Sequence, residues 1–236
     1  MKFSSLLSRF KPNEKQSLPL SSSPLLARMQ QKRIHARRMS MPECFSEKKA
    51  IFIHIPKTAG KSICKNLFHV KRVGHMPYIW YQGIAPKQCS EYFTFSIVRN
   101  PWDRVVSAYS YLLRGGAIKR DFGLSKIVRK YEGFDDFVGK WMCKENIENH
   151  THFIPQYRFI ENQYGVIDID FIGRFETLQS DINKVVGCLK GMRSSVVLDK
   201  ENPSDRGHYR DYYSSESKKI VEDLYSRDVS EFGYYF

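Results

Sequence analysis

The sequence lacks three features that would each indicate a particular class of protein. Its five cysteines are an odd number and include no C-x-x-C pair, which argues against both a disulfide framework and a zinc ribbon. No stretch approaches the roughly 18 apolar residues of a membrane-spanning helix, and residues 1–10 lack the continuous apolar run of a secretory signal. We therefore expect a soluble, cytoplasmic protein without a signal peptide or transmembrane helix.

Acidic residues are scarce in the first part of the chain. Residues 1–49 contain 11 Lys or Arg and only three acids, whereas residues 50–236 contain 27 and 22, so the net charge of +13 divides into +8 and +5. The first segment is also rich in Ser and Pro and poor in large apolar residues, a composition that rarely offsets the entropy lost on ordering. We predict a basic, disordered leader over residues 1–49 and a single folded domain over residues 50–236.

Two patterns in the leader would suit an anionic membrane surface. The apolar residues between Phe3 and Phe10 have the spacing of one stripe along a helix, and a basic stretch at residues 32–38 follows a typical helix start at residues 23–24. A solvated disordered segment or an Arg-rich targeting peptide would have a similar composition. Peripheral membrane attachment through residues 1–40 is therefore one hypothesis among three.

The first chemically informative pattern begins after the leader. Residues 51–55 form a short apolar run typical of a buried parallel strand, and the apolar residues of the following helix come after a loop at residues 56–62. Small residues in this loop allow a close backbone approach, and the N–H groups of the helix start favour an anion. We predict a phosphate-binding loop. Its candidate ligand groups belong to Lys57, Thr58, Ala59, Gly60, Lys61 and Ser62.

Three other interpretations of these features must be weighed. Residues 60–62 match the end of the Walker A motif, which would make the chain a P-loop kinase or NTPase, but the first glycine of that motif is replaced by Ile55. An ordinary turn between strand and helix would not need so many hydrogen-bond donors. A basic nucleic-acid-binding protein would suit the net charge, but residues 50–236 carry only +5, so no nucleic acid partner is expected.

A second strand, loop and helix follow. Residues 92–98 form another apolar run, Arg99 stands at its end, and Ser107 lies about two turns into a helix that begins near Pro101. An arginine at a strand end and a serine on the next helix can hold one phosphate from two sides. Because the carboxyl ends of parallel strands meet at one edge of a sheet, the two loops predict a ligand with two separated phosphate groups.

The rest of the chain continues the alternation of strands and helices. Apolar residues recur at helical spacing over residues 134–141 and 178–189, residues 166–175 have the composition of a third strand, and a last helix is expected at residues 215–227. This order predicts an α/β protein with a P-loop-like three-layer fold, in which helices flank a central, mostly parallel sheet.

Together the two loops resemble the 5′-phosphosulfate loop and the 3′-phosphate motif of sulfotransferases that use 3′-phosphoadenosine 5′-phosphosulfate (PAPS). The most similar branch is that of the carbohydrate sulfotransferases, which includes heparan-sulfate 2-O- and chondroitin-type O-sulfotransferases and bacterial relatives. The resemblance extends from about Ile51 to the C-terminus and includes residues 152–156, 170–176 and 232–234. The chain departs from the family pattern at Lys61, where Thr or Ser is usual, so the role of this residue is left open.

The resemblance implies a chemistry and assigns roles to the loop residues. It implies in-line transfer of a sulfuryl group from PAPS to a hydroxyl acceptor, most simply on a glycan or glycolipid, without a metal. Lys57 would provide the cation at the bridging oxygen, and the backbone N–H groups of residues 58–62 would hold the 5′-phosphate. Arg99 and Ser107 would hold the 3′-phosphate. The identity of the acceptor is not specified by any motif.

An acceptor hydroxyl needs a general base, and histidine has a suitable pKa. Among seven histidines, His75 lies between the first helix and the Arg99 strand, where related sulfotransferases place a catalytic histidine. His152 is the second candidate. His150 and His152 could form half a metal site, but no third ligand is evident, and His54 inside the first strand is most simply a buried, hydrogen-bonded residue.

A polar loop precedes the last predicted helix. In similar sulfotransferases a late loop folds over the nucleotide, which makes Ser204, Arg206 and Tyr209 candidates for a nucleotide contact. A flexible connection between helices would have the same composition, so both interpretations stay open.

Overall fold

A computed structural model describes residues 18–192, 196–198 and 206–236, except for the side chain of Arg120. Its three strands, β1 (Ala50–Ile53), β2 (Phe93–Val98) and β3 (Phe171–Arg174), form one parallel sheet in the order β1-β2-β3. The register pairs Phe52 with Phe95 and Phe95 with Phe171, so three aromatic residues lie in one row across the sheet.

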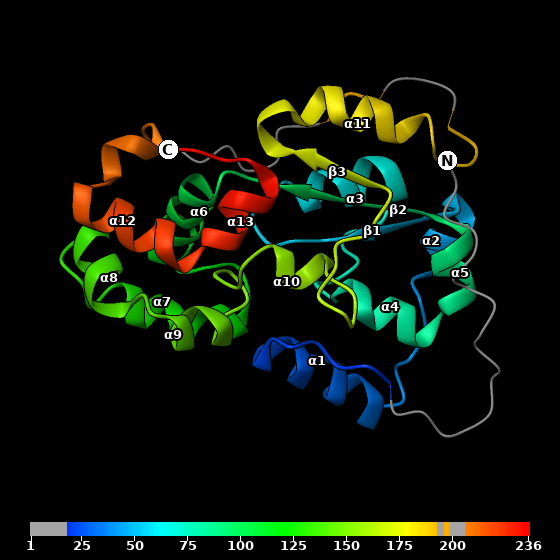
Figure 1. The fold of residues 1–236 in the computed structure, drawn as a ribbon, viewed down its shortest axis with the longest axis horizontal. Helices are drawn as coiled ribbons and strands as arrows, with labels where there is room; N and C mark the ends of the chain where they lie inside the picture. Colours follow the sequence, from blue (N-terminus) through cyan, green and yellow to red (C-terminus); the bar gives the residue numbers. More distant parts are fainter. Residues whose placement is uncertain (1–17, 193–195, 199–205) are drawn as a thin grey trace.

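Helices cover both faces of this sheet. Figure 1 shows α11 (Leu178–Val186) above the strands, and α4 (Tyr78–Ile84) and α10 (Tyr157–Ile160) below them. Helix α3 (Gly60–Phe68) overlaps β2 and β3 in this view, and the ring of its Phe68 stacks on Phe95 of β2. The short helix α5 (Pro86–Glu91) leads into β2. This arrangement confirms the predicted α/β fold with a parallel sheet between helices. It also places the carboxyl ends of β1 and β2 at one edge, where the two predicted ligand loops begin.

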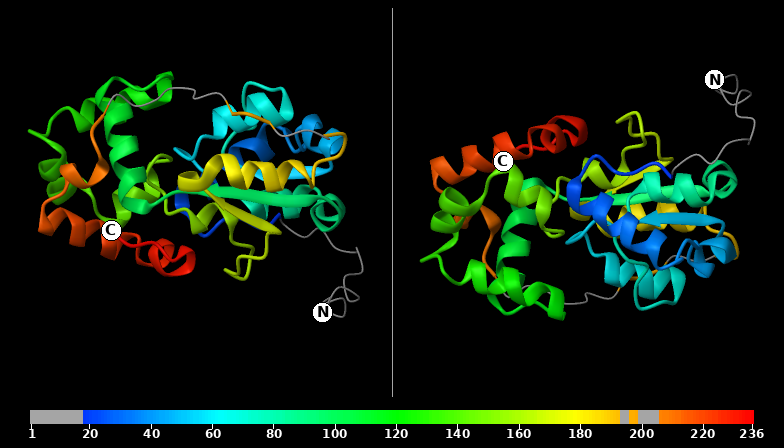
Figure 2. Two further views of the ribbon diagram at one scale, coloured as in Figure 1. Left: turned by 90° about the horizontal axis from the view of Figure 1, so that it is seen from above. Right: turned by 90° about the horizontal axis from the view of Figure 1, so that it is seen from below.

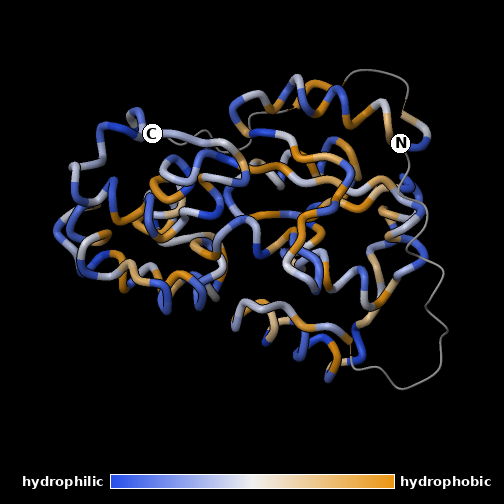
Figure 3. Tube along the Cα trace, viewed as in Figure 1, coloured by the Kyte–Doolittle hydropathy of each residue, from blue (hydrophilic) through white to orange (hydrophobic). Residues whose placement is uncertain are grey.

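Most of the other helices form a second group beside the sheet. This helical group lies to the left of the sheet in both views of Figure 2. It consists of α6 (Pro101–Leu113), α7 (Phe122–Val128), α8 (Phe134–Trp141), α9 (Lys144–Asn149), α12 (Ser215–Leu224) and α13 (Ser226–Phe232), with the 3-10 turns η1 (Lys119–Asp121) and η3 (Tyr209–Tyr212). One hydrophobic cluster surrounds the sheet and another lies within this helical group. Figure 3 shows the apolar residues concentrated along the strands and on one side of most helices.

Helix α6 joins the two groups and has clear start and stop signals. The side chain of Asn100 accepts hydrogen bonds from the N–H groups of Trp102 and Asp103, and Pro101 occupies the first helical position, where its fixed φ suits a helix. The helix ends before Gly115 and Gly116, whose φ angles of 106° and 69° are unfavourable for other residues. Its first residue matches the prediction of a helix that begins near Pro101.

The expected disordered leader is wrong for residues 18–49. These residues form α1 (Pro24–His35) and α2 (Glu43–Lys48), and the side chains of Leu26 and Phe45 are fully buried in the core around the sheet. Gln30, also fully buried, accepts from the Ser21 N–H (2.7 Å) and donates to the Pro19 carbonyl (3.0 Å). The composition failed as a guide because most of the few large apolar residues pack in or against the core, although Leu20 and Met39 are exposed.

The apolar stripe between Phe3 and Phe10 lies outside the described residues, so membrane attachment stays a prediction. In the part of the chain that is described, no helix is long and apolar enough to cross a bilayer.

Two of the differences from the predicted element boundaries have a tertiary cause. The third strand covers only residues 171–174, because the carboxylate of Asp170 accepts from the backbone N–H and the hydroxyl of Thr94 (2.7 and 2.8 Å) at the point where pairing begins. The last predicted helix is divided at Tyr225 into α12 and α13. Tyr225 is buried, and its hydroxyl donates to the Phe153 carbonyl (2.6 Å).

Candidate functional site

The candidate site is made by two loops at the carboxyl edge of the sheet. The first loop (residues 56–62) connects β1 to α3, and the second loop (residues 99–104) connects β2 to α6 and includes the first turn of that helix. Because β1 and β2 are adjacent and parallel, the two loops lie side by side, as the sequence predicted.

The first loop has an uncommon backbone conformation. Lys57 and Ala59 have φ angles of 73° and 63°, in the left-handed region that residues with a side chain rarely adopt. The Thr58 hydroxyl donates to the Ile55 carbonyl (2.9 Å) and closes the turn, and no side chain of the described residues caps the start of α3. Strained backbone of this kind is concentrated at functional sites, and an uncapped helix start offers N–H groups to an anion.

Gly60 at the start of α3 is required by its close approach to a histidine. A Cβ atom at this position would lie 1.8 Å from Nε2 of His54. The buried His54 ring stacks on Phe52 (centroids 5.5 Å apart) and contacts the ring of His75 (4.1 Å). Its Nδ1 atom has no hydrogen-bond partner among the described residues, and burial together with the charge of His75 holds the pKa of His54 well below its ordinary value. The neutral His54 ring thus packs between Gly60 of the first loop and the ring of His75.

His75 has a defined orientation. Its Nδ1 atom lies 2.9 Å from the backbone carbonyl of His54. A carbonyl oxygen can only accept a hydrogen bond, so Nδ1 carries a proton, and in the neutral form of the ring the lone pair belongs to Nε2. The structure therefore gives His75 the tautomer in which Nε2 can act as a base.

Lys57 is surrounded by positive charge. Burial, followed by the charges of Arg99, Arg114, Lys61 and Arg206, lowers the pKa of Lys57 to about 7. Its ammonium group lies 4.2 Å from the centre of the Tyr111 ring, a cation–π distance. This concentration of cations would favour an anionic ligand at the same place.

Arg99 connects the two loops. Its Nη1 donates to the carbonyl of Lys57 (3.0 Å), its Nε donates to Asp103 (2.7 Å), and its guanidinium lies on the ring of Phe175 (3.8 Å). Arg206, from the late polar loop, also pairs with Asp103. Arg99 therefore holds the left-handed turn at Lys57 as well as standing at the predicted phosphate position.

The backbone of the second loop is fixed by side chains from distant segments. The amide of the fully buried Gln156 accepts from the Arg99 N–H (2.9 Å) and donates to the Arg99 carbonyl (2.8 Å). Glu176 accepts from the Asn100 N–H (2.7 Å) and from the hydroxyl of Tyr234 (2.8 Å). Residues 152–156, 170–176 and 232–234 were recognised as family motifs, and these contacts give three of their residues a structural role.

The other predicted ligands occupy suitable elements. Ser62 is buried in the first turn of α3, Lys61 beside it is exposed, and Ser107 is 8% exposed on α6. Tyr209 lies in η3 against the ring of Phe236 (5.6 Å). Ser204 lies outside the described residues. Binding of a 3′-phosphate by Ser107 stays a prediction.

His152, the second candidate base, belongs to a cluster that the sequence did not reveal. Its Nε2 lies 3.1 Å from Oδ1 of Asp121, and the hydroxyl of Tyr111 donates to Oδ2 of the same carboxylate (2.5 Å). Burial raises the pKa of Asp121, but the hydrogen bonds from His152 and Tyr111 outweigh it and hold this pKa well below its ordinary value. Asp121 and Tyr111 are separated from Lys57 in the sequence and carry no motif of their own.

Comparison with known proteins agrees with this geometry. The model of the sulfotransferase family matches residues 44–235. The chain belongs to this family. The match confirms the resemblance that the two loops suggested, and it favours a sulfotransferase over a Walker A kinase or NTPase.

Two relatives are similar to this chain. Carbohydrate sulfotransferase 14 from Danio rerio is 25% identical over an alignment of 225 residues. The alignment covers 80% of this chain and 60% of the relative. An uncharacterized protein from Archaeoglobus fulgidus is 36% identical over 103 residues, which include 44% of this chain and 72% of the relative. The chain thus spans less than two thirds of the Danio rerio protein. No solved structure matches it.

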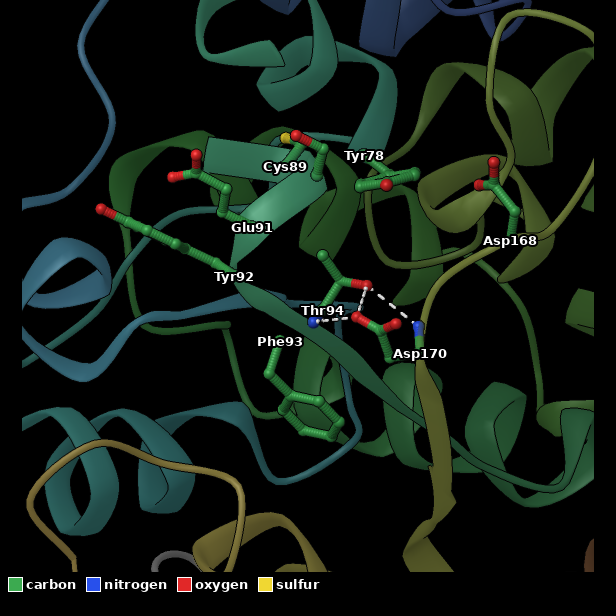
Figure 4. A pocket seen from close by; sticks show the side chains of 9 residues that line it. Tyr78, Cys89, Glu91, Tyr92, Phe93, Thr94, Asp168 and Asp170 are labelled. Carbon is green, nitrogen blue, oxygen red and sulfur yellow. Dashed lines mark hydrogen bonds between the residues drawn. The ribbon is translucent and has the colours of Figure 1, made fainter. Parts of the chain in front are cut away.

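A cavity of about 260 Å³ lies elsewhere in the structure. Figure 4 shows its lining by Tyr78, Asp168 and the residues around the start of β2, at the amino end of the strand and not at the edge that carries the two loops. Ligands of parallel α/β sheets bind at the carboxyl ends of the strands. The cavity is therefore separate from the candidate site.

No cluster of three or more His, Cys, Asp or Glu side chains suited to a metal occurs within the described ranges. Within those ranges the Nε2 atom of His152 lies 3.1 Å from Oδ1 of Asp121.

Proposed function

We propose that this sulfotransferase transfers a sulfuryl group from PAPS to a hydroxyl group of a glycan or glycolipid. The observation that carries the proposal is the meeting of three features at one edge of the sheet: the Lys57 ammonium, the uncapped start of α3 and the Arg99 guanidinium. A donor with phosphate groups at both its 5′ and 3′ positions would use all three.

The residues of the site fit a polyanionic nucleotide. The left-handed conformations at Lys57 and Ala59 alternate with ordinary ones, an arrangement that can turn successive backbone N–H groups toward one anion. Burial and, after it, four neighbouring cations lower the pKa of Lys57, and a polyanion would relieve the mutual repulsion of these cations. In this proposal the N–H groups of residues 58–62 hold the 5′-phosphate, and Arg99 with Ser107 holds the 3′-phosphate.

Each catalytic step is assigned to a side chain of known orientation. PAPS, when bound, supplies the sulfuryl group. Lys57 offsets the negative charge that builds on the departing phosphate oxygen, and Nε2 of His75 accepts the proton of the attacking hydroxyl. No residue forms a covalent bond, so the protein contributes position and fixed charge.

The acceptor class is inferred from the relative. The similar protein from Danio rerio is a carbohydrate sulfotransferase, which favours a carbohydrate hydroxyl as the acceptor.

Nucleotide binding provides the first test. We expect the desulfonated product, 3′-phosphoadenosine 5′-phosphate, to raise the melting temperature without magnesium, because a ligand at 100 times its dissociation constant adds about 2.7 kcal/mol of stability. ATP with Mg²⁺ should give a much smaller shift. A shift with ATP alone would contradict the proposal.

The identity of the base is tested by turnover. We expect His75→Ala to keep its affinity for the product nucleotide and to lower kcat by roughly 10²–10⁴-fold, the range typical of a general base. His152→Ala is the matched comparison and should retain more activity. The reverse order would assign the proton transfer to His152.

A further inference from the structure

A continuous series of contacts leads from Lys57 to His152. The Lys57 ammonium lies 4.2 Å from the centre of the Tyr111 ring, the Tyr111 hydroxyl donates to Oδ2 of Asp121 (2.5 Å), and Oδ1 of Asp121 lies 3.1 Å from Nε2 of His152. The ring of Tyr111 also meets the ring of His152 edge-on, with centroids 5.2 Å apart. The proposed chemistry uses Lys57 but assigns nothing to Tyr111 or Asp121.

The surrounding chain holds Asp121 in place. The carboxylate is 4% exposed, and the backbone N–H of Ala117 donates to the Tyr111 hydroxyl (2.7 Å). A Cβ atom at Gly116 would lie 2.5 Å from Cβ of Asp121, so the glycine turn after α6 lets η1 approach Tyr111. Since its pKa is held low, Asp121 is ionised at neutral pH.

The carboxylate acts on Lys57 through the Tyr111 ring. A phenol that donates to a carboxylate gains electron density, which strengthens the attraction between the ring face and a cation. This attraction opposes the influences that lower the pKa of Lys57, namely its burial and the charges of its four cationic neighbours. The ring also restricts where the ammonium can lie.

We propose that Tyr111 and Asp121 are positioning residues for Lys57: the Tyr111 ring holds the ammonium beside the first loop in its charged form, and Asp121 fixes and polarises that ring. The inference rests on the proposed function, because Lys57 must be charged and fixed in place if it is to offset the negative charge on the departing phosphate oxygen. The pKa of Lys57, however, can be measured on the protein alone, without PAPS or an acceptor.

The titration of Lys57 tests the inference directly. The rate of acetylation of its amine by acetic anhydride is followed against pH by mass spectrometry, with the exposed Lys130 as internal reference. We expect Tyr111→Leu to lower the pKa of Lys57 by about 1, the size of a desolvated cation–π interaction. Tyr111→Phe and Asp121→Asn keep the ring and should give smaller shifts in the same direction.

Each outcome of the titration decides the inference. An unchanged pKa of Lys57 in Tyr111→Leu overturns it. A shift in Tyr111→Leu with none in Asp121→Asn overturns the role of Asp121 alone. Thermal unfolding shows which variants are folded, and if Tyr111→Leu is not, Tyr111→Phe and Asp121→Asn retain the shape of the site and give the answer.

Turnover separates this inference from the proposed function. If the wild type does not use PAPS, the proposed function fails while the titration result stands. If it does, Tyr111→Leu should lower kcat/KM more at pH 8 than at pH 6, because the loss of charge on Lys57 moves to lower pH. An equal loss at both pH values would indicate a merely structural role and would contradict the inference.

Discussion

The two loops at the carboxyl edge of the sheet hold their backbones in opposite ways. The first loop has two non-glycine residues in the left-handed region and an uncapped helix start. The second loop is tied to the rest of the fold by Gln156, by Glu176 and by the Asn100 cap of α6. The first loop thus leaves backbone N–H groups for a ligand, whereas the backbone groups of the second loop form hydrogen bonds within the protein.

This difference separates activity from stability. Backbone N–H groups that face a ligand cannot be used for hydrogen bonds within the protein, so the first loop keeps a strained conformation. Arg99 stabilises that conformation by donating a hydrogen bond to the carbonyl of Lys57. Groups that only position Arg99 can be fully satisfied and buried. Substitutions in the first loop should therefore reduce turnover more than stability, and substitutions in the supports of the second loop should do the reverse.

The largest expected effect is the loss of turnover in Lys57→Ala. We expect kcat to fall by about 10³-fold, since a fixed charge at the departing oxygen contributes on this scale, with no loss of stability. Initial rates of PAPS-dependent transfer and urea unfolding measure the two quantities. Lys61→Ala, an exposed lysine in the same loop, is the control and should lose less than about tenfold. Equal losses in both variants would remove the special role of Lys57.

The second effect is the loss of stability in Gln156→Leu. The substitution leaves the N–H and the carbonyl of Arg99 buried without a partner, which should lower the free energy of unfolding by about 3 kcal/mol. Gln163→Leu makes the same change at an exposed position, where we expect about 0.5 kcal/mol or less. Similar unfolding midpoints for both variants in urea would show that Gln156 does not support the second loop.

The Gly60→Ala substitution tests whether the first loop positions His75, the proposed base. The added Cβ would overlap the His54 ring and displace it against His75, so we expect kcat to fall by about 10²-fold, as small misplacements of reacting groups can do. Gly123→Ala is the matched control, because Gly123 also lies in the first turn of a helix and a Cβ there would meet no atom within 4 Å. A fully active Gly60→Ala would contradict the proposed link.

The smallest effect concerns pH. The pKa of Lys57 is about 7 in the folded protein, below its ordinary value, so between this value and about pH 10.4 the unfolded chain binds more protons than the folded one. The destabilisation caused by Lys57 therefore decreases as pH rises through this window. The stability difference between Lys57→Met and the wild type should narrow by about 1 kcal/mol per pH unit within it, as measured by urea unfolding. A constant difference would show that Lys57 titrates normally.

Local patterns predicted the elements that build the site. The apolar runs predicted β1 and β2, and Pro101 predicted the start of α6. The length of β3 could not be predicted because the tie between Asp170 and Thr94 joins residues 76 positions apart. Composition misjudged residues 18–49, since burial depends on where a few apolar side chains point and not on their number.

The sequence by itself determined the two strand–loop–helix units that build the site and the family to which the chain belongs, because these depend on residues close together along the chain. The tertiary structure alone decided which side chains surround Lys57. Tyr111 and Asp121 carry no local signal, and they matter only because α6 and η1 bring a ring and a carboxylate into contact beside the first loop. Such interactions act over a few ångströms in space, whatever the distance along the chain.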